Sequence, residues 1–560
     1  MEDWYEQTRS YALRLTRFFS QTDTQGETDF GAYLKDLLAE IPYYKENPGD
    51  LRLVQTLSDP IERFVLFALV RGRGAQTIIF TGHYDVVGIE NYGELEEWAC
   101  DPESLLPKLI SLLKKEDQIS PGLSPNDRLA LDDLTSGQFL PGRGLLDMKC
   151  GLAAGISVLQ RFSQLPVGER PVSLLFIAVP DEEIASNGAR TAGALLPDLA
   201  REWNLDFTAA INLDASDDHG DGSRGQTVYL GSVGKLLPSV YLVGRETHAG
   251  SPFSGINANL LAAELTRRIE CNPELGDSLE GMYAAPPTCL KQADTKTHYD
   301  VTTPTHTWCY YNWLTLQHPV GSVLEKMCGL VKEALGAAMI SIQASARQFS
   351  LLSNQPIIIP DWIPQVYTFS EVKELALQRA GPGFEDQLEI LEQQLASDPA
   401  LDTPTCCLRL TETVWSASGL SGPAAVVAFS AIFYPPVTIQ NVPGRAARLL
   451  QTVTRVAEDL SREKNTPITL QPFFPGISDI SFFGGRVSPV ETKILAANTP
   501  AWKHRTGFDY SGISRLGIPA VNIGPWGRDY HQRIERVQMP YSFEILPEFL
   551  WKIALQYLSA

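Results

Sequence analysis

The chain contains 560 residues, more than one ordinary hydrophobic core supports, so we expect at least two domains. Hydrophobic residues make up 44% of the sequence and charged residues 20%, which is typical of a folded globular protein. The net charge of −20 argues against nucleic acid as a partner, because binding to phosphates needs a basic surface, and against adhesion to anionic membranes.

The N-terminal sequence and the cysteines predict a cytoplasmic protein. The segment Met1–Tyr5 is acidic and lacks the basic and apolar regions of a signal peptide. No run approaches the roughly 18 consecutive apolar residues of a membrane span. The eight cysteines contain no Cys-x-x-Cys pair and have no regular spacing, so we expect them to be reduced.

The first predicted elements lead to a His-x-Asp motif. Residues 29–41 place apolar side chains along one helical face, and residues 64–70 predict a strand. A second strand over 77–83 ends at His83. Because side chains two apart in a strand share a face, Asp85 can orient the imidazole of His83 for metal binding. An isolated motif of this kind is more often a histidine hydrogen-bonded to its neighbour, so the metal interpretation depends on residues further along.

A second candidate ligand follows a polar insertion. Residues 92–142 are rich in polar residues, and we interpret them as an insertion over the rim of the site, with a short helix at 109–115. After it, Gly142-Arg143-Gly144 permits a tight backbone path, and Asp147 lies where a strand passes into a helix. The two oxygens of this carboxylate could bridge two metal ions. On its own, Asp147 would more often be a helix cap.

Two further strands end in acidic residues. The apolar run 173–179 leads to the Asp-Glu-Glu triplet at 181–183, and the run 207–213 leads to Asp214. Adjacent carboxylates repel one another, so they need a cation or a solvated turn, and an ordinary polar turn explains the triplet equally well. Their occurrence after the His-x-Asp strand favours a common site. The alternation of strands and helices predicts an α/β fold with a mostly parallel central sheet.

A smaller module interrupts this pattern. Residues 232–348 alternate strand, helix, strand and helix, and they contain His248 in a loop with glycine and proline. A surface or capping role explains this histidine as well as a functional one does. We therefore expect a main domain in two parts, 1–231 and 349–560, interrupted by a domain at 232–348.

The last candidate ligand lies on a loop after residues 519–525, which predict a buried strand. This loop contains His531, and Glu535 is four residues on, where a helical turn would let it orient the imidazole. The candidate ligands at strand ends are His83, Asp147, Glu183, Asp214 and His531. Imidazole and carboxylate ligands without thiolate suit zinc, with cobalt or manganese as alternatives.

One bridging aspartate with two ligands on either side predicts a dinuclear centre. Such a centre lowers the pKa of a bound water and polarises a carbonyl group. A free carboxylate must then take the proton of the water. Glu182, next to Glu183 but outside the ligand set, is the candidate general base.

The order of these motifs resembles the dinuclear zinc metallopeptidases and amidohydrolases that include aminoacylase, glutamate carboxypeptidase, succinyl-diaminopimelate desuccinylase and peptidase T. The lid motif of that family, His-x-Gly-x-Pro-x-x-Gly-x-Asn-Ala, is matched by residues 248–258. The resemblance spans nearly the whole chain. The family's metal and catalytic motifs are matched, in order, at His83 with Asp85, Asp147, Glu182 with Glu183, Asp214 and His531.

This resemblance implies a phosphorylase/hydrolase-like zinc-peptidase catalytic domain, interrupted by a smaller α+β lid domain through which a homodimer would form. It implies two zinc ions, Glu182 as general base and His248 as a residue that stabilises the oxyanion across the dimer. The substrate would be a peptide or an N-acyl amino acid. Details such as Gly524-Pro525-Trp526-Gly527 are most similar to the arginine-utilization branch, which favours an arginine-related amide. No residue matches the lid arginine that binds a substrate carboxylate, so carboxypeptidase specificity stays open.

Two other functions remain to be weighed. A catalytically silent relative could bind metal or a small ligand for regulation, since retention of motifs is not activity. A nucleotide-binding α/β protein is disfavoured, because no predicted strand is followed by Gly-x-Gly-x-x-Gly or by Gly-x-x-x-x-Gly-Lys-Ser/Thr.

Overall fold

The computed structural model describes residues 3–57, 59, 61–119, 122–217, 226–359, 361–398 and 400–559. The chain divides into two compact units. The first unit comprises Met1–Ser232, Val437–Arg486 and Asp509–Ala560, and the second comprises Val233–Pro436 and Val487–Phe508.

A large mixed sheet forms the centre of the first unit, and its described strands follow the order β1-β2-β5-β3-β6-β20-β8-β19. The central strands β5, β3, β6 and β20 are mutually parallel, whereas β2 and β8 run antiparallel to their inner neighbours. The predicted α/β fold is therefore confirmed, with a parallel centre and antiparallel edges. The strands are β1 (Leu51–Gln55), β2 (Phe64–Val70), β3 (Gln76–His83), β5 (Ser173–Val179), β6 (Asp206–Asn212), β8 (Gln226–Tyr229), β19 (Ile468–Gln471) and β20 (Ala520–Asn522).

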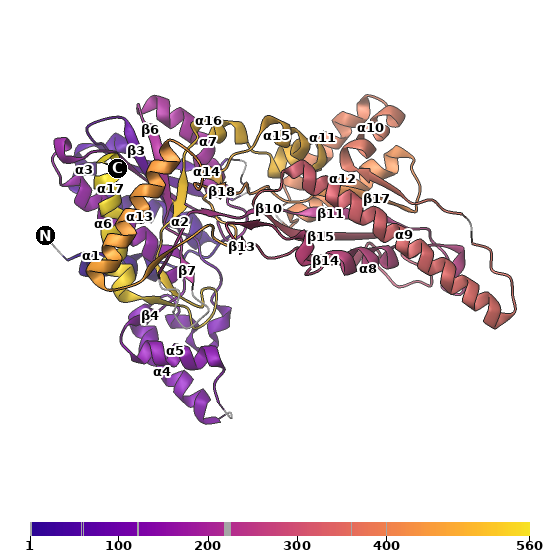
Figure 1. Ribbon diagram of the computed structural model, residues 1–560, viewed down its shortest axis with the longest axis horizontal. Helices are drawn as coiled ribbons and strands as arrows, with labels where there is room; N and C mark the ends of the chain where they lie inside the picture. Colours follow the sequence, from indigo (N-terminus) through magenta and orange to yellow (C-terminus); the bar gives the residue numbers. More distant parts are fainter. Residues whose placement is uncertain are drawn as a thin grey trace. The chain divides into compact units, whose positions relative to one another are not determined.

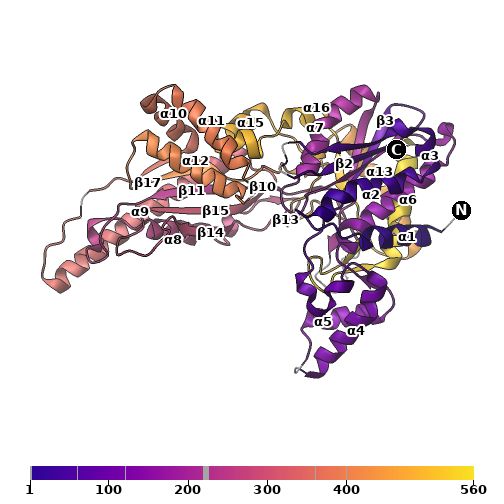
Figure 2. The same cartoon turned by 180° about the vertical axis from the view of Figure 1, so that it is seen from behind.

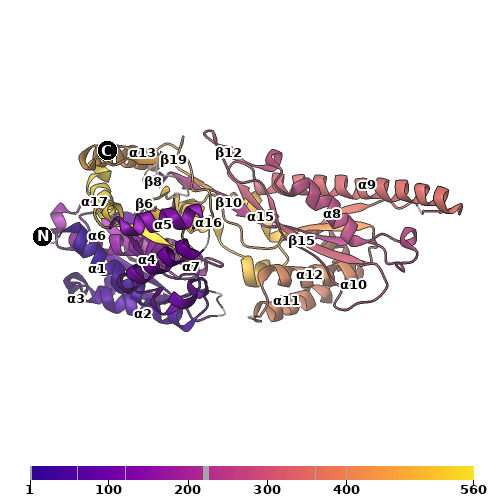
Figure 3. The same cartoon turned by 90° about the horizontal axis from the view of Figure 1, so that it is seen from below.

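Helices cover both faces of this sheet (Figures 1 and 3). One face carries α6 (Cys150–Ser163), α13 (Arg445–Lys464) and α17 (Leu546–Gln556), and the other carries α7 (Asn187–Glu202), against which α16 (Tyr510–Leu516) packs. The N-terminal helices of this unit are α1 (Trp4–Arg17), α2 (Gln25–Ala39) and α3 (Pro42–Glu46). The strands are apolar on both faces because both faces are covered.

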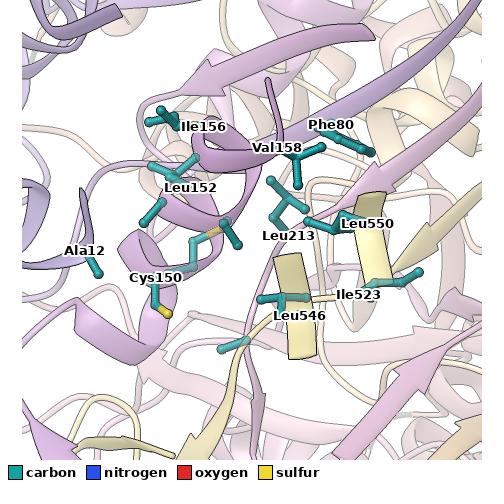
Figure 4. Close-up of a cluster of buried hydrophobic side chains, with 14 of the residues drawn as sticks. Ala12, Phe80, Cys150, Leu152, Ile156, Val158, Leu213, Ile523, Leu546 and Leu550 are labelled. Carbon is teal, nitrogen blue, oxygen red and sulfur yellow. The ribbon is translucent and has the colours of Figure 1, made fainter. Parts of the chain in front are cut away.

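The core under α6 brings two predicted motifs together. Figure 4 shows Leu152 and Ile156 of α6 near Leu213, with Leu546 and Leu550 of α17 on the other side, and all five side chains are fully buried. Helix α6 approaches the end of β6 so closely that a Cβ on Gly151 would lie 2.0 Å from the carbonyl oxygen of Leu213. Glycine at this position therefore lets the turn before α6 lie beside the acidic end of β6.

The insertion at 92–142 is helical in the structure. It contains the 3₁₀ helix η2 (Glu90–Trp98), α4 (Pro102–Ile119) and α5 (Pro125–Thr135), so the short helix expected at 109–115 is part of a longer one. Figures 1 and 2 show α4 and α5 side by side, and Figure 1 shows strand β4 next to them. A small sheet joins this insertion to the C-terminal part of the unit, in the order β4 (Phe139–Pro141), β22 (Arg536–Gln538), β21 (Trp526–Arg528) and β7 (Ser216–Asp217).

The second unit is a sheet with helices on both faces (Figures 1 and 3). Its strands lie in the order β10 (Gly234–Leu236), β15 (His306–Thr315), β11 (Pro238–Val243), β17 (Ala424–Phe429) and β16 (Gln365–Thr368), with β14 (Thr288–Asp294) paired to β15. One face is covered by α8 (Ala258–Ile269) and α9 (Val320–Ser353), and the other by α10 (Phe369–Ala380), α11 (Gly383–Ala396) and α12 (Thr403–Ser418).

The second unit is larger than the expected range 232–348. Residues 349–436 belong to it rather than to the main unit, because β17 pairs with β11 along its whole length and β16 pairs with β17. The segment Val487–Phe508, which contains α15 (Pro489–Asn498), also belongs to it. Strand β17 is fully buried and apolar, so it needs a neighbour on each side, and the sequence does not say which sheet supplies them.

Helix α9 is the one helix, among the described residues, that is long and apolar enough to cross a membrane by length and composition alone. Such a helix is also typical of the interior of a globular unit. Its N-terminal half packs against the rest of the second unit, and Val323, Met327, Val331 and Leu335 are buried there.

Candidate metal centre

The candidate ligands lie at one edge of the large sheet. His83 is the last residue of β3, Glu183 follows β5 and Asp214 follows β6. Because β5, β3 and β6 are adjacent and parallel, their carboxyl ends meet at the same edge. Asp147 lies in the turn before α6, and His531 lies in the loop between β21 and β22.

Asp147 lies between the two histidines. Its Oδ1 atom is 3.0 Å from Nε2 of His83, and its Oδ2 atom is 3.1 Å from Nε2 of His531. Each imidazole also faces another carboxylate: His83 Nε2 is 3.7 Å from Asp214 Oδ1, and His531 Nε2 is 3.2 Å from Glu183 Oε1. The structure therefore brings all five predicted ligands together, with two on either side of Asp147.

The charges of these groups perturb one another. Burial opposes the protonated form of His83, but the carboxylates of Asp147, Asp214 and Asp85 outweigh it and raise the pKa of His83 well above its usual value. Burial likewise opposes protonation of His531, while Asp147 and Glu183 raise its pKa to about 10. In contrast, burial raises the pKa of both Asp214 and Glu183. The site thus binds protons where a cation would also be favourable.

The side chains present fit a bound metal ion. Donor atoms of His83, Asp147 and Glu183 lie within 4.8 Å of one another, a spacing compatible with metal binding in this cluster. The carboxylates of Asp147, Glu183 and Asp214 repel each other unless positive charge is present. Imidazole nitrogen and carboxylate oxygen together form a donor set that suits zinc, cobalt or manganese. The side chain of His531 is 42% exposed, so one side of the cluster is accessible from solvent.

Asp85 holds the acidic turn as well as lying beside His83. The Nδ1 atom of His83 contacts the main-chain oxygen of Asp85 at 3.0 Å, whereas the Asp85 carboxylate is 3.6 Å away. That carboxylate instead accepts the backbone N–H groups of Glu182 at 3.1 Å and Glu183 at 3.2 Å, and the hydroxyl of Thr22 at 3.0 Å. The main-chain oxygen of Asp85 therefore orients the imidazole of His83, and its carboxylate positions the backbone of the two glutamates.

Glu535 acts on the loop of His531 through Arg143 rather than through the imidazole. Arg143 forms a buried ion pair with Glu535, and it donates to the carbonyl oxygen of His531 at 3.2 Å. Glu535 also accepts the N–H of Leu146 at 3.3 Å, next to Asp147. This contact between the two loops joins residues that are far apart in the sequence, so spacing along the chain could not predict it.

Sequence reasoning missed Arg63. This arginine is 2% exposed and lies between β1 and β2, where it pairs with Asp181 at 2.8 Å, Asp59 at 2.8 Å and Glu27 at 3.3 Å. Asp181 begins the acidic triplet and has a positive φ of 68°, an unusual conformation for a residue with a side chain. The one available signal was a charged residue directly before a wholly apolar strand.

The remaining predicted residues are Glu182 and His248. Burial raises the pKa of Glu182 well above its usual value; His83 lowers it, and Asp479, Asp214 and Glu183 raise it further. His248 lies on an exposed loop of the second unit, where its Nδ1 accepts the N–H of Gly250 at 3.0 Å. Its proposed role toward the oxyanion stays a prediction.

Comparisons with known proteins identify the family of this chain. The model of peptidase family M20/M25/M40 matches residues 131–515. The chain belongs to this family. This M20-family protein is therefore a metal-dependent hydrolytic enzyme. Its candidate metal site contains His83, Asp147 and Glu183.

Relatives of this M20-family protein cover its full length. It is 29% identical to Protein RocB of Bacillus subtilis, over 99% of this chain and 95% of RocB. It is 30% identical to the uncharacterized protein YqjN of the same organism, over 98% of this chain and 96% of YqjN. An M20-family metallo-carboxypeptidase from Sulfolobus solfataricus has a similar fold, with a TM-score of 0.51, 13% identity and 99% coverage of each chain.

Proposed function

We propose that this M20-family enzyme hydrolyses a peptide or N-acyl amide bond of a small substrate derived from an amino acid, with two zinc ions. His83, Asp147 and Asp214 would hold one ion, and Asp147, Glu183 and His531 the other. The observation that carries this proposal is the position of Asp147, whose two oxygens face different imidazoles at 3.0 and 3.1 Å. Cobalt or manganese would suit the same donor atoms.

Each residue then has a defined task. When bound, the two ions would polarise the carbonyl group of the substrate and lower the pKa of a water molecule. Glu182 takes the proton of the attacking water and passes it to the leaving amine. Asp85 accepts the backbone N–H of Glu182, a contact that would hold this base in position for the reaction. His248 would stabilise the oxyanion, as in the family that the sequence resembles.

The substrate that we propose is an amide or peptide related to arginine, in the cytoplasm. The support is the resemblance to the arginine-utilization branch together with the full-length similarity to RocB. We propose that the second unit, which contains nearly all of the expected lid range 232–348, acts as the lid domain.

We further propose a homodimer formed through the second unit. Exposed apolar side chains on α9 support it, since Ile340 is 69%, Leu351 84% and Leu352 80% exposed, and exposed groups of this kind often lie in interfaces. Replacing Leu351 and Leu352 by glutamate should convert the dimer to a monomer in light scattering. A wild-type chain that is monomeric at all concentrations would contradict the proposal.

The decisive experiment compares the wild type with Glu182→Gln. The zinc-loaded proteins are incubated with arginine- and ornithine-containing dipeptides and their N-acyl derivatives, and metal content is measured by elemental analysis. We expect Glu182→Gln to lose at least about 10²-fold in turnover with its metal content unchanged. Glu169→Gln, which removes the same charge from an exposed position, is the matched control. A wild type that binds no metal, or turnover unaffected by Glu182→Gln, would overturn the proposal.

A further inference from the structure

The loop that carries His531 has an unfavourable backbone. Both His531 and Asp529 have positive φ angles, 63° and 56°, in the left-handed region that residues with a side chain occupy at a cost in free energy. A loop of this kind keeps its shape only if contacts from other parts of the chain hold it. Because the imidazole lies 3.1 Å from Asp147 and 3.2 Å from Glu183, any change in the loop displaces a candidate ligand.

The α4–α5 insertion supplies these contacts from acidic side chains. Arg533, two residues after His531, makes a bidentate pair with Glu116 of α4, with both N–O distances 2.8 Å, and lies 3.4 Å from Asp127 of α5. Two parallel hydrogen bonds fix direction as well as distance, which a single exposed ion pair does not.

A second, buried contact lies at the end of the same loop. Arg536 is fully buried, and it binds Asp133 of α5 through Nε at 2.9 Å and Nη2 at 2.7 Å. Its Nη1 atom donates to Asp529 at 2.7 Å and to the carbonyl of Ile534 at 3.0 Å. The guanidinium group thus joins the insertion to both ends of the His531 loop.

The carbonyl of His531 is held from the segments on either side of the two helices. Asn91 of η2 donates to it at 2.9 Å, and Arg143, just after β4, donates at 3.2 Å. Arg143 also donates to Asn91 at 3.1 Å, so these two side chains support each other. The two helices are themselves anchored to the core of the first unit by the buried side chains Leu105, Leu109, Leu113, Ala130 and Leu134.

We propose that the α4–α5 insertion is a positioning element for His531: the acidic side chains Glu116, Asp127 and Asp133 hold the loop, and so set the affinity of the half of the metal centre formed by Glu183 and His531. This inference rests on the proposed metal centre. His83 and Asp214, in the other half, lie at the ends of β3 and β6, so we expect that half to depend less on the insertion.

The test is stepwise titration of the full-length, metal-free chain with Co²⁺, followed by visible absorption and calorimetry. In Glu116→Gln/Asp127→Asn we expect one of the two binding steps to weaken about tenfold, the low end of the effect seen when a residue supporting a metal ligand is removed, with the other step unchanged. The matched control is Glu96→Gln/Asp132→Asn, which removes two charges from exposed positions of the same insertion. Thermal unfolding is measured in parallel.

A charge exchange keeps the test decisive if the double variant folds poorly. Arg533→Glu should weaken the same step, and adding Glu116→Arg should restore much of it, because the pair is re-formed with opposite polarity. Unchanged Co²⁺ binding in Glu116→Gln/Asp127→Asn, equal weakening of both steps, or absence of rescue would overturn this inference alone. A wild-type chain that binds no Co²⁺ would overturn the metal centre and this inference with it.

Discussion

Replacing Asp85 by asparagine should displace the backbone of Glu182 and Glu183 while leaving His83 in place. The change keeps the shape of the side chain but removes its charge and one of its two acceptor oxygens. Those oxygens accept the N–H groups of Glu182 and Glu183 and the hydroxyl of Thr22. The main-chain oxygen that contacts His83 is unaffected by the substitution.

The size of the effect follows from these hydrogen bonds. The asparagine would place its NH₂ group where the fewest bonds are lost, toward the N–H of Glu182. One bond to a charged group is then lost, worth about 1.5–3 kcal/mol, and the other two become bonds to a neutral group, each weaker by about 1 kcal/mol. Relief of the buried charge offsets part of this, so we expect a loss of about 2–4 kcal/mol in the free energy of unfolding. Displacement of Glu182 by about 1 Å should lower kcat about 10²-fold.

The assay combines urea denaturation, Co²⁺ titration and steady-state kinetics. We expect a lower kcat and weaker binding of the ion on the Glu183 side. The ion on the His83 side should bind nearly as in the wild type. Equal loss of both ions would mean that Asp85 acts mainly on His83. Turnover and stability within about twofold and 0.5 kcal/mol of the wild type would refute the reasoning.

Three other outcomes are expected. Arg143→Met should weaken metal binding about 10–100-fold, because the carbonyl of His531 loses this donor and Glu535 stays buried without its ionic partner. In calorimetry, Arg143→Lys should recover part of the metal affinity. No recovery would count against a role of the ion pair. Arg63→Met should lower the free energy of unfolding by about 3–5 kcal/mol in urea denaturation because Asp181, among others, loses a buried ionic partner; a loss under about 1 kcal/mol would contradict this. Asp147 and Glu183 outweigh burial and raise the pKa of His531 to about 10 without metal, so a cation must displace its proton. The apparent affinity for Co²⁺ should therefore rise between pH 6 and 8. The same proton stabilises the metal-free fold fully below a pH of about 6.5, and this stabilisation is lost as the pH rises through about 10.

Residues at strand ends could be predicted well from the sequence. An apolar run shows where a buried strand ends, and parallel neighbours bring such ends together, which is why His83, Glu183 and Asp214 could be assigned to one edge before any coordinates. The structure adds that Asp147 lies between the imidazoles. It also shows that Arg533, two residues after His531 in the same loop, pairs with Glu116 of the insertion, a contact that the sequence did not predict.

Pairings between distant segments could not be predicted. The apolar pattern of β17 shows a buried strand, but the same pattern would suit either sheet, and its pairing with β11 decides the extent of the second unit. Likewise, the spacing between His531 and Glu535 suggested a local contact, whereas Glu535 binds Arg143, which is 392 residues away in the sequence. Side-chain partners of this kind depend on tertiary packing and leave no periodic trace in the sequence.

The candidate ligands come from five separate stretches of the first unit, and the last of them, His531, follows the whole second unit in the sequence. During translation, therefore, a ribosome-bound chain lacks one candidate ligand until residue 531 has emerged and the loop that contains it has folded. If the proposed metal centre forms, binding at His531 would then mark the end of synthesis and folding of the first unit.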